Sequence, residues 1–223
     1  MICILIGISG ASGSGKTSYS QSLAKRLKSP LKPISLDNFC CQSPPQTYHP
    51  KLGKLWNYET PESLKSEELY KLLSSIKQCQ TMEKLMNYAK NNRYLAAQNS
   101  DNNDTNFIYI VVEGFLLFAL TDPLTHLFDI RLFLDAEKET CCRRRYVRES
   151  KNHLDVNGEE INESFKLWFD DLVWKHYLEH KDRQKQAAHQ SIHERDYTNS
   201  NYAQIDAIVD DKIAKIIYEN INK

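Results

Sequence analysis

A glycine-rich segment near the start of the chain has the residue types and spacing that bind phosphate. It reads Gly10-Ala11-Ser12-Gly13-Ser14-Gly15-Lys16-Thr17 and fits the pattern G-x-x-x-x-G-K-[ST], with Ser18 directly after it. Glycines let the backbone curl until its N–H groups converge on an anion, the lysine reaches the outer phosphates, and the threonine hydroxyl can ligate Mg²⁺. The segment therefore predicts a site for a phosphate chain and Mg²⁺.

The residues around this segment fit the strand, loop and helix order that the motif requires. Residues 2–8 are a continuous apolar run rich in β-branched side chains, which is typical of a strand buried on both faces. Residues 18–28 carry Leu23 and Leu27 four positions apart among polar residues, which indicates an amphipathic helix. The alternative is a glycine turn with an accidental lysine, and this context disfavours it.

Three acidic residues directly follow apolar segments: Asp37, Glu113 and Asp135. In a parallel sheet these positions share one edge with the phosphate loop, where a carboxylate can support Mg²⁺ or take a proton from an attacking hydroxyl. We expect Glu113, which comes after six apolar residues and before glycine, to have such a role. Asp135 precedes Ala136-Glu137-Lys138, and there we favour a helix N-cap.

Four arginines stand close together in one predicted helix: Arg143, Arg144, Arg145 and Arg148. At about 100° per residue, the last three share one face and Arg143 points nearly opposite. Three guanidinium groups beside a phosphate site suit a clamp on charge that develops during phosphoryl transfer, although a solvated basic face has the same pattern. The segment after them contains Asn157-Gly158, so we expect a small lid over roughly residues 141–165.

The remaining pattern predicts a single α/β domain over residues 1–223. Further strands are expected at residues 31–36, 107–112, 130–134 and near 190–197. Further helices are expected from residue 61 with Thr60 as N-cap, and over 81–90, 136–149, 163–180 and 205–221. Residues 40–57, 91–106 and 150–162 are expected as loops. Strands that alternate with helices indicate a parallel sheet that binds its ligands at the carboxyl ends of the strands.

Composition narrows the function classes. Lys+Arg and Asp+Glu are equal at 29 each, so no overall field favours nucleic acid or an anionic membrane as partner. No apolar run reaches the roughly 20 residues that span a bilayer, and the N-terminus lacks the features of a signal peptide. The six cysteines show no zinc-ligand spacing, which favours free thiols and a cytoplasmic location. Oligomeric state stays open.

The chain resembles the nicotinamide riboside kinases, within the uridine kinase-like P-loop nucleoside kinases. The matching segments, which keep their order from residue 2 to about 180, are residues 7–10 and 14–17, 34–39, 57–64, 112–118 and 141–148, with a weaker match at 168–174. The most specific are Glu113-Gly114-Phe115-Leu116-Leu117-Phe118 and the arginine run. The resemblance implies a five-stranded parallel sheet with a small lid, ATP and Mg²⁺ as cofactors, and a small-molecule nucleoside as partner.

The resemblance also implies a role for individual residues. Asp37 would take the proton from the ribose 5′-hydroxyl, with Asn38 and Phe39 beside it on the substrate side. Tyr58 would stack on the base and Glu59 would bind the ribose hydroxyls. Arg144 and Arg148 would contact ATP, and Arg145 would lie nearer the transferred phosphate. Mg²⁺ would be held by Thr17, Asp37 and Glu113. Residues near Thr198–Tyr202 could touch the adenine.

The chain departs from the family pattern at two places, and other functions stay open. The family usually has Asp where this chain has Glu59, and its second ring-stacking tyrosine would fall near Ser150. A uridine-cytidine kinase is the first alternative, but those enzymes read the pyrimidine with a Y-D-F-x-x-H-x-R hairpin, and Asn91 stands where its histidine should be. A switch protein that hydrolyses a nucleoside triphosphate, and a binding protein without catalysis, are more distant alternatives.

Overall fold

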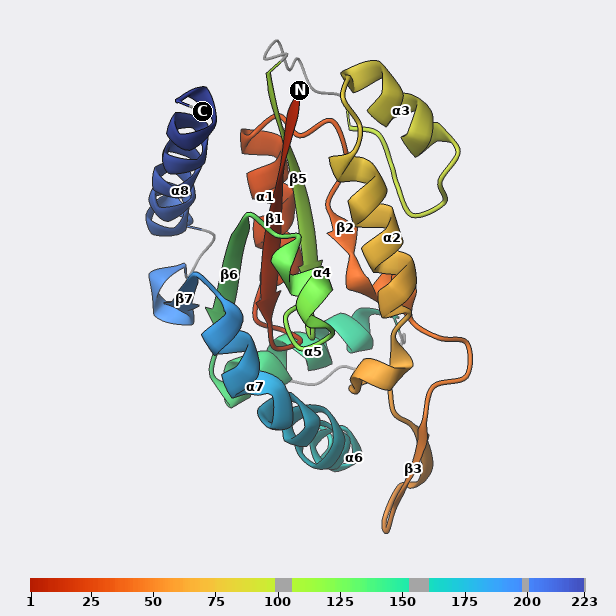
Figure 1. Ribbon diagram of the computed structural model, residues 1–223. Helices are drawn as coiled ribbons and strands as arrows, with labels where there is room; N and C mark the ends of the chain where they lie inside the picture. Colours follow the sequence, from red (N-terminus) through yellow and green to blue (C-terminus); the bar gives the residue numbers. More distant parts are fainter. Residues whose placement is uncertain (99–105, 153–160, 198–200, 223) are drawn as a thin grey trace.

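A five-stranded, fully parallel sheet forms the centre of the molecule, as the sequence predicts. The computed structural model describes residues 1–98, 106–152, 161–197 and 201–222, without the side chains of 150–152 (Figure 1). The strand order is β2-β5-β1-β6-β7. The strands are β1 (Ile2–Gly10), β2 (Ile34–Ser35), β5 (Phe107–Gly114), β6 (Ile130–Asp135) and β7 (Gln190–His193). Their carboxyl ends meet at one edge, below the sheet in Figure 1.

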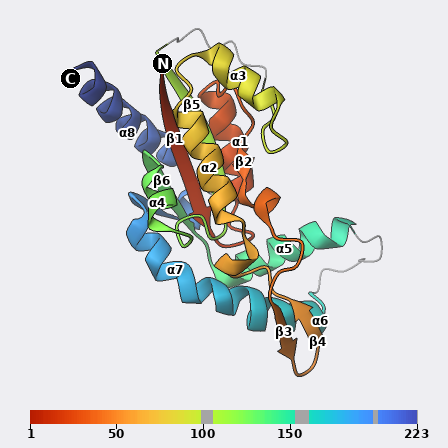
Figure 2. The same ribbon diagram turned by 45° about the vertical axis from the view of Figure 1, so that its right-hand side comes forward.

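Helices cover both faces of the sheet (Figure 1, Figure 2). They are α1 (Lys16–Arg26), α2 (Ser66–Lys77), α3 (Met82–Lys90), α4 (Asp122–His126), α5 (Lys138–Asn152), α6 (Glu163–Trp168), α7 (Lys175–Ala187) and α8 (Ala203–Ile221). Strand β1 shows how the layers form, because its successive side chains point to opposite faces. Cys3 and Leu5 pack with α2, α3 and α4, whereas Ile4 and Ile6 pack with α1 and α8.

A third apolar cluster holds the helices that cross the carboxyl edge of the sheet. Phe133 of β6 packs there against Cys141 of α5, Tyr177 of α7, and Phe169 and Val173 of the π-helical stretch Phe169–Trp174. This stretch joins α6 to α7, so the helix predicted at 163–180 is continuous but changes its winding. The cluster places α5 and α7 over the edge where ligands are expected to bind.

The expectation of a loop over residues 40–57 is wrong. Residues Gln46–His49 (β3) and Gly53–Trp56 (β4) pair as an antiparallel hairpin that projects from the body (Figure 2). Pro50 lies in the turn, where no ladder hydrogen bond is lost, and Gly53 has a φ of 76°, which glycine adopts freely. Pro50 lies in the turn, Gly53 begins β4, and Pro44 and Pro45 come before β3, so none of these prolines interrupts the strand pairing.

The helix start expected at residue 61 is also wrong. Pro61–Ser63 form a 3₁₀ turn without a side-chain cap from Thr60, and α2 begins at Ser66. The reason is tertiary, because Leu64 is held in an extended conformation by a β-bridge to Cys40.

Asp135 does not cap a helix. It ends β6, α5 begins three residues later, and its carboxylate pairs with Lys181 and Lys185 of α7 at 2.8 Å each. Burial raises the pKa of Asp135, but the hydrogen bonds and charges of the two lysines outweigh it and hold the pKa below the ordinary value. Asp135 therefore ties α7 to the sheet.

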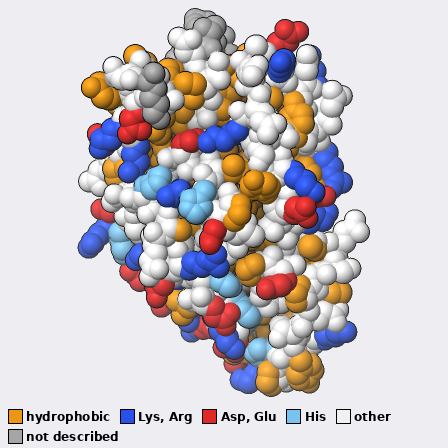
Figure 3. All heavy atoms as spheres, in the orientation of Figure 1, with side chains coloured by type: hydrophobic (Ala, Val, Ile, Leu, Met, Phe, Trp, Pro, Cys, Tyr) orange, Lys and Arg blue, Asp and Glu red, His pale blue; other side chains and the backbone are white. Residues whose placement is uncertain are grey.

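Some expectations fall outside the described residues. These are part of the segment expected to be flexible at 150–162, the side chain of Ser150, and part of the stretch Thr198–Tyr202. All six cysteines are free thiols. Within the ranges that the structure describes, no helix is both long and apolar enough to span a bilayer. Acidic and basic side chains are interspersed over the face drawn in Figure 3, in line with the balanced charge.

Candidate active site

The glycine-rich loop lies between β1 and α1 and has the backbone that its sequence predicts. Gly13 and Gly15 have φ values of 88° and 98°, which side chains rarely tolerate. A Cβ at Gly13 would lie 2.4 Å from the carbonyl oxygen of Cys141 in α5, so the loop and that helix approach closely. The Tyr197 hydroxyl donates to the Ser14 carbonyl oxygen at 2.9 Å and braces the loop from the other side.

Lys16 and Ser14 offer hydrogen-bonding groups that the described residues leave unused. The buried Lys16 ammonium has three donors, and the described hydrogen bond is to the Ala11 carbonyl oxygen at 2.8 Å. The Ser14 hydroxyl is buried and finds no partner within the described residues. Burial lowers the pKa of Lys16, and the charges of Glu113 and Asp37 oppose that shift. Such a cradle fits an anion such as a phosphate chain.

Thr17 and Glu113 form an oxygen pair that suits Mg²⁺. The Thr17 hydroxyl donates to the Glu113 carboxylate at 3.3 Å, and the Glu113 side chain is buried at the end of β5. Across the described ranges, no three His, Cys, Asp or Glu residues gather as a metal site. Mg²⁺ is commonly held by one or two protein oxygens together with phosphates and waters, so this pair fits an ion that arrives with a nucleotide.

Asp37 lies on the same edge, opposite the loop. It belongs to the 3₁₀ turn Leu36–Phe39 that follows β2, and its N–H donates to the Ser35 hydroxyl at 3.4 Å. Ser35 pairs in register with Glu113, which sets Asp37 just beyond the buried carboxylate. Asp37 itself is exposed, so its oxygens can meet a ligand.

Three arginines of α5 contact the site, as the helical spacing predicts. Arg144 donates to the Gly13 carbonyl oxygen and Arg148 to the Ser12 hydroxyl, each at 3.4 Å. Arg145 reaches away from the loop and donates to the Glu59 carboxylate at 3.0 Å. Arg143 lines a separate surface cavity on the opposite side of the helix. One face of α5 therefore contacts both the glycine-rich loop and Glu59.

Two cavities meet at the carboxylates. The smaller, about 400 Å³, is formed by the glycine-rich loop with Lys16, Arg144 and Phe115. The larger, about 800 Å³, extends from Arg145 past Ser35 to Lys32 and Gln98. Four residues line both cavities: Thr17, Asp37, Glu113 and Arg148. A group held in one cavity can therefore meet a group held in the other beside Asp37.

The segment after the hairpin forms the far side of the site. Glu59 is buried and pairs with Arg145, whose guanidinium also stacks over the Trp168 ring at 4.6 Å. Tyr58 is 40% exposed, which leaves its ring free to stack on a ligand. Tyr58 and Glu59 do not line the two cavities described above, and Glu59 is connected to them through Arg145.

The side chains of Asn38 and Phe39 differ in their surroundings. Asn38 is exposed next to Asp37. Phe39 is fully buried, and its ring stacks on Tyr94 with centroids 4.3 Å apart. Phe39 therefore belongs to the core in this structure, and the expectation that it contacts substrate is replaced by a role in anchoring the turn that carries Asp37.

Sequence reasoning missed or undervalued several residues of the site. Tyr197 braces the glycine-rich loop, Trp168 supports Arg145, and His176 of α7 contacts Asn57 at 2.9 Å. None of them stands in a local pattern that points to this edge. Only folding brings them there, and Trp168 alone lay in a segment with a weak family match.

Comparisons with known proteins assign the chain to a family. Residues 5–200 match the model of the "Phosphoribulokinase / Uridine kinase family", and the chain belongs to this family. It is 29% identical over 178 residues to a uridine kinase of Schizosaccharomyces pombe, covering 75% of this chain and 37% of that protein. It is 30% identical over 167 residues to a uridine kinase of Ureaplasma parvum, covering 73% and 72%.

A solved structure described as a possible uridine kinase from Bacillus stearothermophilus aligns with 86% of this chain and 89% of its own, with 15% identity and a TM-score of 0.46. In the two sequence comparisons, the chain spans little more than a third of the length of the Schizosaccharomyces pombe uridine kinase and about seven-tenths of the length of the Ureaplasma parvum uridine kinase.

Proposed function

We propose that the protein is a kinase that uses ATP and Mg²⁺ to phosphorylate the ribose 5′-hydroxyl of a nucleoside. The observation that carries this proposal is the pair of cavities that share Thr17, Asp37, Glu113 and Arg148. One is a cradle for a phosphate chain and the other has room for a second, polar molecule. Kinases need this arrangement, because donor and acceptor must meet in line while water is kept away.

In this proposal each group has a role, which for Tyr58 and Glu59 rests on the resemblance because they do not line the two cavities. Lys16 and the loop amides hold the outer phosphates, and Thr17 and Glu113 hold Mg²⁺, which neutralises charge on the phosphates. Asp37 orients the acceptor hydroxyl and accepts its proton. Arg144 and Arg148 meet ATP, and Arg145 lies nearest the acceptor. Tyr58 stacks on the base and Glu59 accepts hydrogen bonds from the ribose hydroxyls.

The preferred nucleoside is nicotinamide riboside, and nicotinamide mononucleotide is then the product. The resemblance of the matched segments supports this choice. Uridine or cytidine is the second candidate, and the names of the relatives, which are uridine kinases, favour uridine. Against a pyrimidine read by a histidine hairpin, residues 82–90 are the helix α3, followed by a turn at Asn91. Within the described residues, an antiparallel hairpin lies elsewhere, at residues 46–56.

An acceptor panel tests the proposal. Release of ADP from ATP, or of GDP from GTP, is measured with Mg²⁺ and with nicotinamide riboside, uridine, cytidine, adenosine or pantothenate as acceptor. We expect turnover that depends on a nucleoside and is fastest with nicotinamide riboside. Turnover with uridine or cytidine alone would reverse the order of the two candidates. Nucleotide hydrolysis of equal rate without any acceptor would support a switch protein instead.

A further inference from the structure

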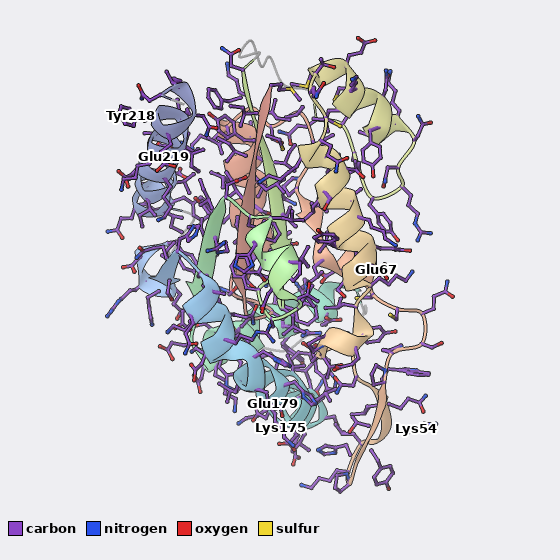
Figure 4. The ribbon with its side chains drawn as sticks, viewed as in Figure 1. Lys54, Glu67, Lys175, Glu179, Tyr218 and Glu219 are labelled. Carbon is purple, nitrogen blue, oxygen red and sulfur yellow. The ribbon has the colours of Figure 1, made fainter. Side chains whose placement is uncertain are left out.

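The hairpin segment is tied to the long helix beside it by two histidine contacts (Figure 2). His49 Nε2 of β3 lies 2.9 Å from Asp171 of the π-helical stretch. His176 Nε2 of α7 lies 2.9 Å from Asn57 Nδ2, just after β4. Figure 4 labels Lys54 on the hairpin, and Lys175 and Glu179 on α7, at the same end of the molecule. The two contacts look alike, but only the second continues toward the active site.

A chain of hydrogen bonds runs from α7 to Arg145. Glu179 Oε2 lies 2.9 Å from His176 Nδ1, and a carboxylate only accepts, so Nδ1 carries the proton. His176 Nε2 then has a free lone pair and accepts from Asn57 Nδ2. Asn57 Oδ1 accepts from the Glu59 backbone N–H at 3.0 Å. The Glu59 carboxylate in turn accepts from Arg145 at 3.0 Å.

The inner members of this chain are shielded from water, and of the buried donors at its end only Arg145 Nε has no hydrogen-bond partner within the described residues. Asn57 and Glu59 are 5% and 7% exposed. Because a buried amide has two ends, the histidine decides which end faces Glu59: an acceptor at Nε2 turns the Asn57 amide nitrogen toward α7 and its oxygen toward Glu59. A second anchor holds the same turn from its other side, since the single proton of the Ser63 hydroxyl is shared between the Tyr58 and Thr60 carbonyl oxygens, 2.8 and 2.6 Å from Oγ.

We propose that His176 is a positioning residue for the acceptor half of the site. It acts through Asn57 on Glu59 and, through Glu59, on Arg145, which lines the larger cavity beside Asp37. This inference rests on the proposed function, because it assigns that cavity to the acceptor. The cradle for ATP is built from other residues, so His176 controls the binding of the acceptor and not that of the nucleotide.

Three substitutions separate the hydrogen-bonding role from mere bulk. His176→Gln keeps an amide oxygen near the place of Nε2, His176→Asn keeps polar atoms only near the place of Nδ1, and His176→Phe keeps the ring volume alone. Steady-state kinetics give KM for the acceptor, KM for ATP and kcat. We expect KM for the acceptor to rise about 3- to 10-fold in the Phe and Asn variants, and to return close to the wild-type value in the Gln variant.

Asp171→Ala is the matched control. It breaks the other contact between hairpin and helix but leaves intact the chain of hydrogen bonds from Glu179 to Arg145, which we call the relay. We expect its KM for the acceptor to stay within about twofold of the wild type, as for an exposed pair. Equal increases in Asp171→Ala and His176→Phe would show that docking of the hairpin, not the relay, is what matters, and would overturn the inference. Equal changes in KM for ATP and for the acceptor would also overturn it.

A measurement on the unaltered protein guards against variants that fail to fold. Nitrogen NMR of the His176 ring at neutral pH should show a protonated Nδ1 and an unprotonated Nε2. The opposite tautomer would refute the relay even if none of the variants folded. Failure of the proposed function looks different: the wild-type protein would then turn over no nucleoside, while the tautomer and its loss on Glu179→Ala, which removes the acceptor of the Nδ1 proton, would still report on the relay.

Discussion

The two halves of the candidate site are built in opposite ways. The phosphate half is centred on one contiguous stretch, residues 10–18, shaped by its own glycines and by the start of α1, to which Arg144 and Arg148 of α5 are added. The acceptor half joins Glu59 to Arg145 across 86 residues and Asn57 to His176 across 119. A contiguous stretch changes little when distant parts of the chain change, whereas an assembled one depends on all of its elements. We therefore expect nucleotide binding to be the more robust property, and acceptor choice the more easily altered one.

Replacing Lys16 should have the largest effect. Lys16→Met removes the ammonium that meets the transferred phosphate in the proposed function, and we expect kcat to fall about 1,000-fold. Because burial lowers the pKa of Lys16, its charge is held at a cost in the protein without nucleotide. The Met variant should then unfold at the same temperature as the wild type or a higher one. Calorimetry checks this point, and a large loss of thermal stability would contradict it.

Asp37→Asn should have the second largest effect on activity, because Asp37 lies at the boundary between the phosphate half and the acceptor half. The amide keeps the size of the side chain but cannot take the proton of the acceptor, so we expect kcat to fall roughly 100-fold. KM values for ATP and acceptor should change little, because the exposed side chain holds no other element in place. Turnover of the Asn variant near the wild-type rate would remove the assignment of Asp37 as the base.

Glu59→Gln sharpens the comparison within the acceptor half. It weakens the charged hydrogen bond to Arg145 and the expected bonds to ribose, so KM for the acceptor should rise about tenfold. Nucleotide affinity, measured by titration calorimetry with ATP, should stay within about twofold. An equal loss of ATP affinity would mean that the halves are not separate.

The smallest effect on activity is expected at Asp135, which supports the structure behind both halves. Its folded-state pKa lies below the ordinary 3.8, so the stability that it adds is present above that pH and is lost as pH falls through the folded-state value. Asp135→Asn should lower the free energy of unfolding by about 1–3 kcal/mol at neutral pH. The gap to the wild type should close in acid, which denaturant titrations at several pH values would show.

Much of the fold followed from patterns within short segments. The runs at residues 2–8, 107–112 and 130–134 are buried strands because apolar, β-branched side chains gain most from a sheet covered on both faces. The spacing of Arg144, Arg145 and Arg148 places them on one side of α5 for the same local reason. The sequence analysis missed the hairpin at residues 46–56, because Pro44, Pro45 and Pro50 suggested a loop although all three lie outside the paired strands.

The candidate site divides along the same line. The sequence alone determined the backbone of the glycine-rich loop, the position of Glu113 at a strand end and the shared face of Arg144, Arg145 and Arg148, since each depends on bond geometry and side-chain spacing within a few residues. Only the tertiary structure decided that Asp135 binds two lysines, that Phe39 lies in the core and that His176 reaches Asn57. The physical reason is that these contacts join segments far apart in the chain, and no local preference records which distant partner a folded side chain will meet.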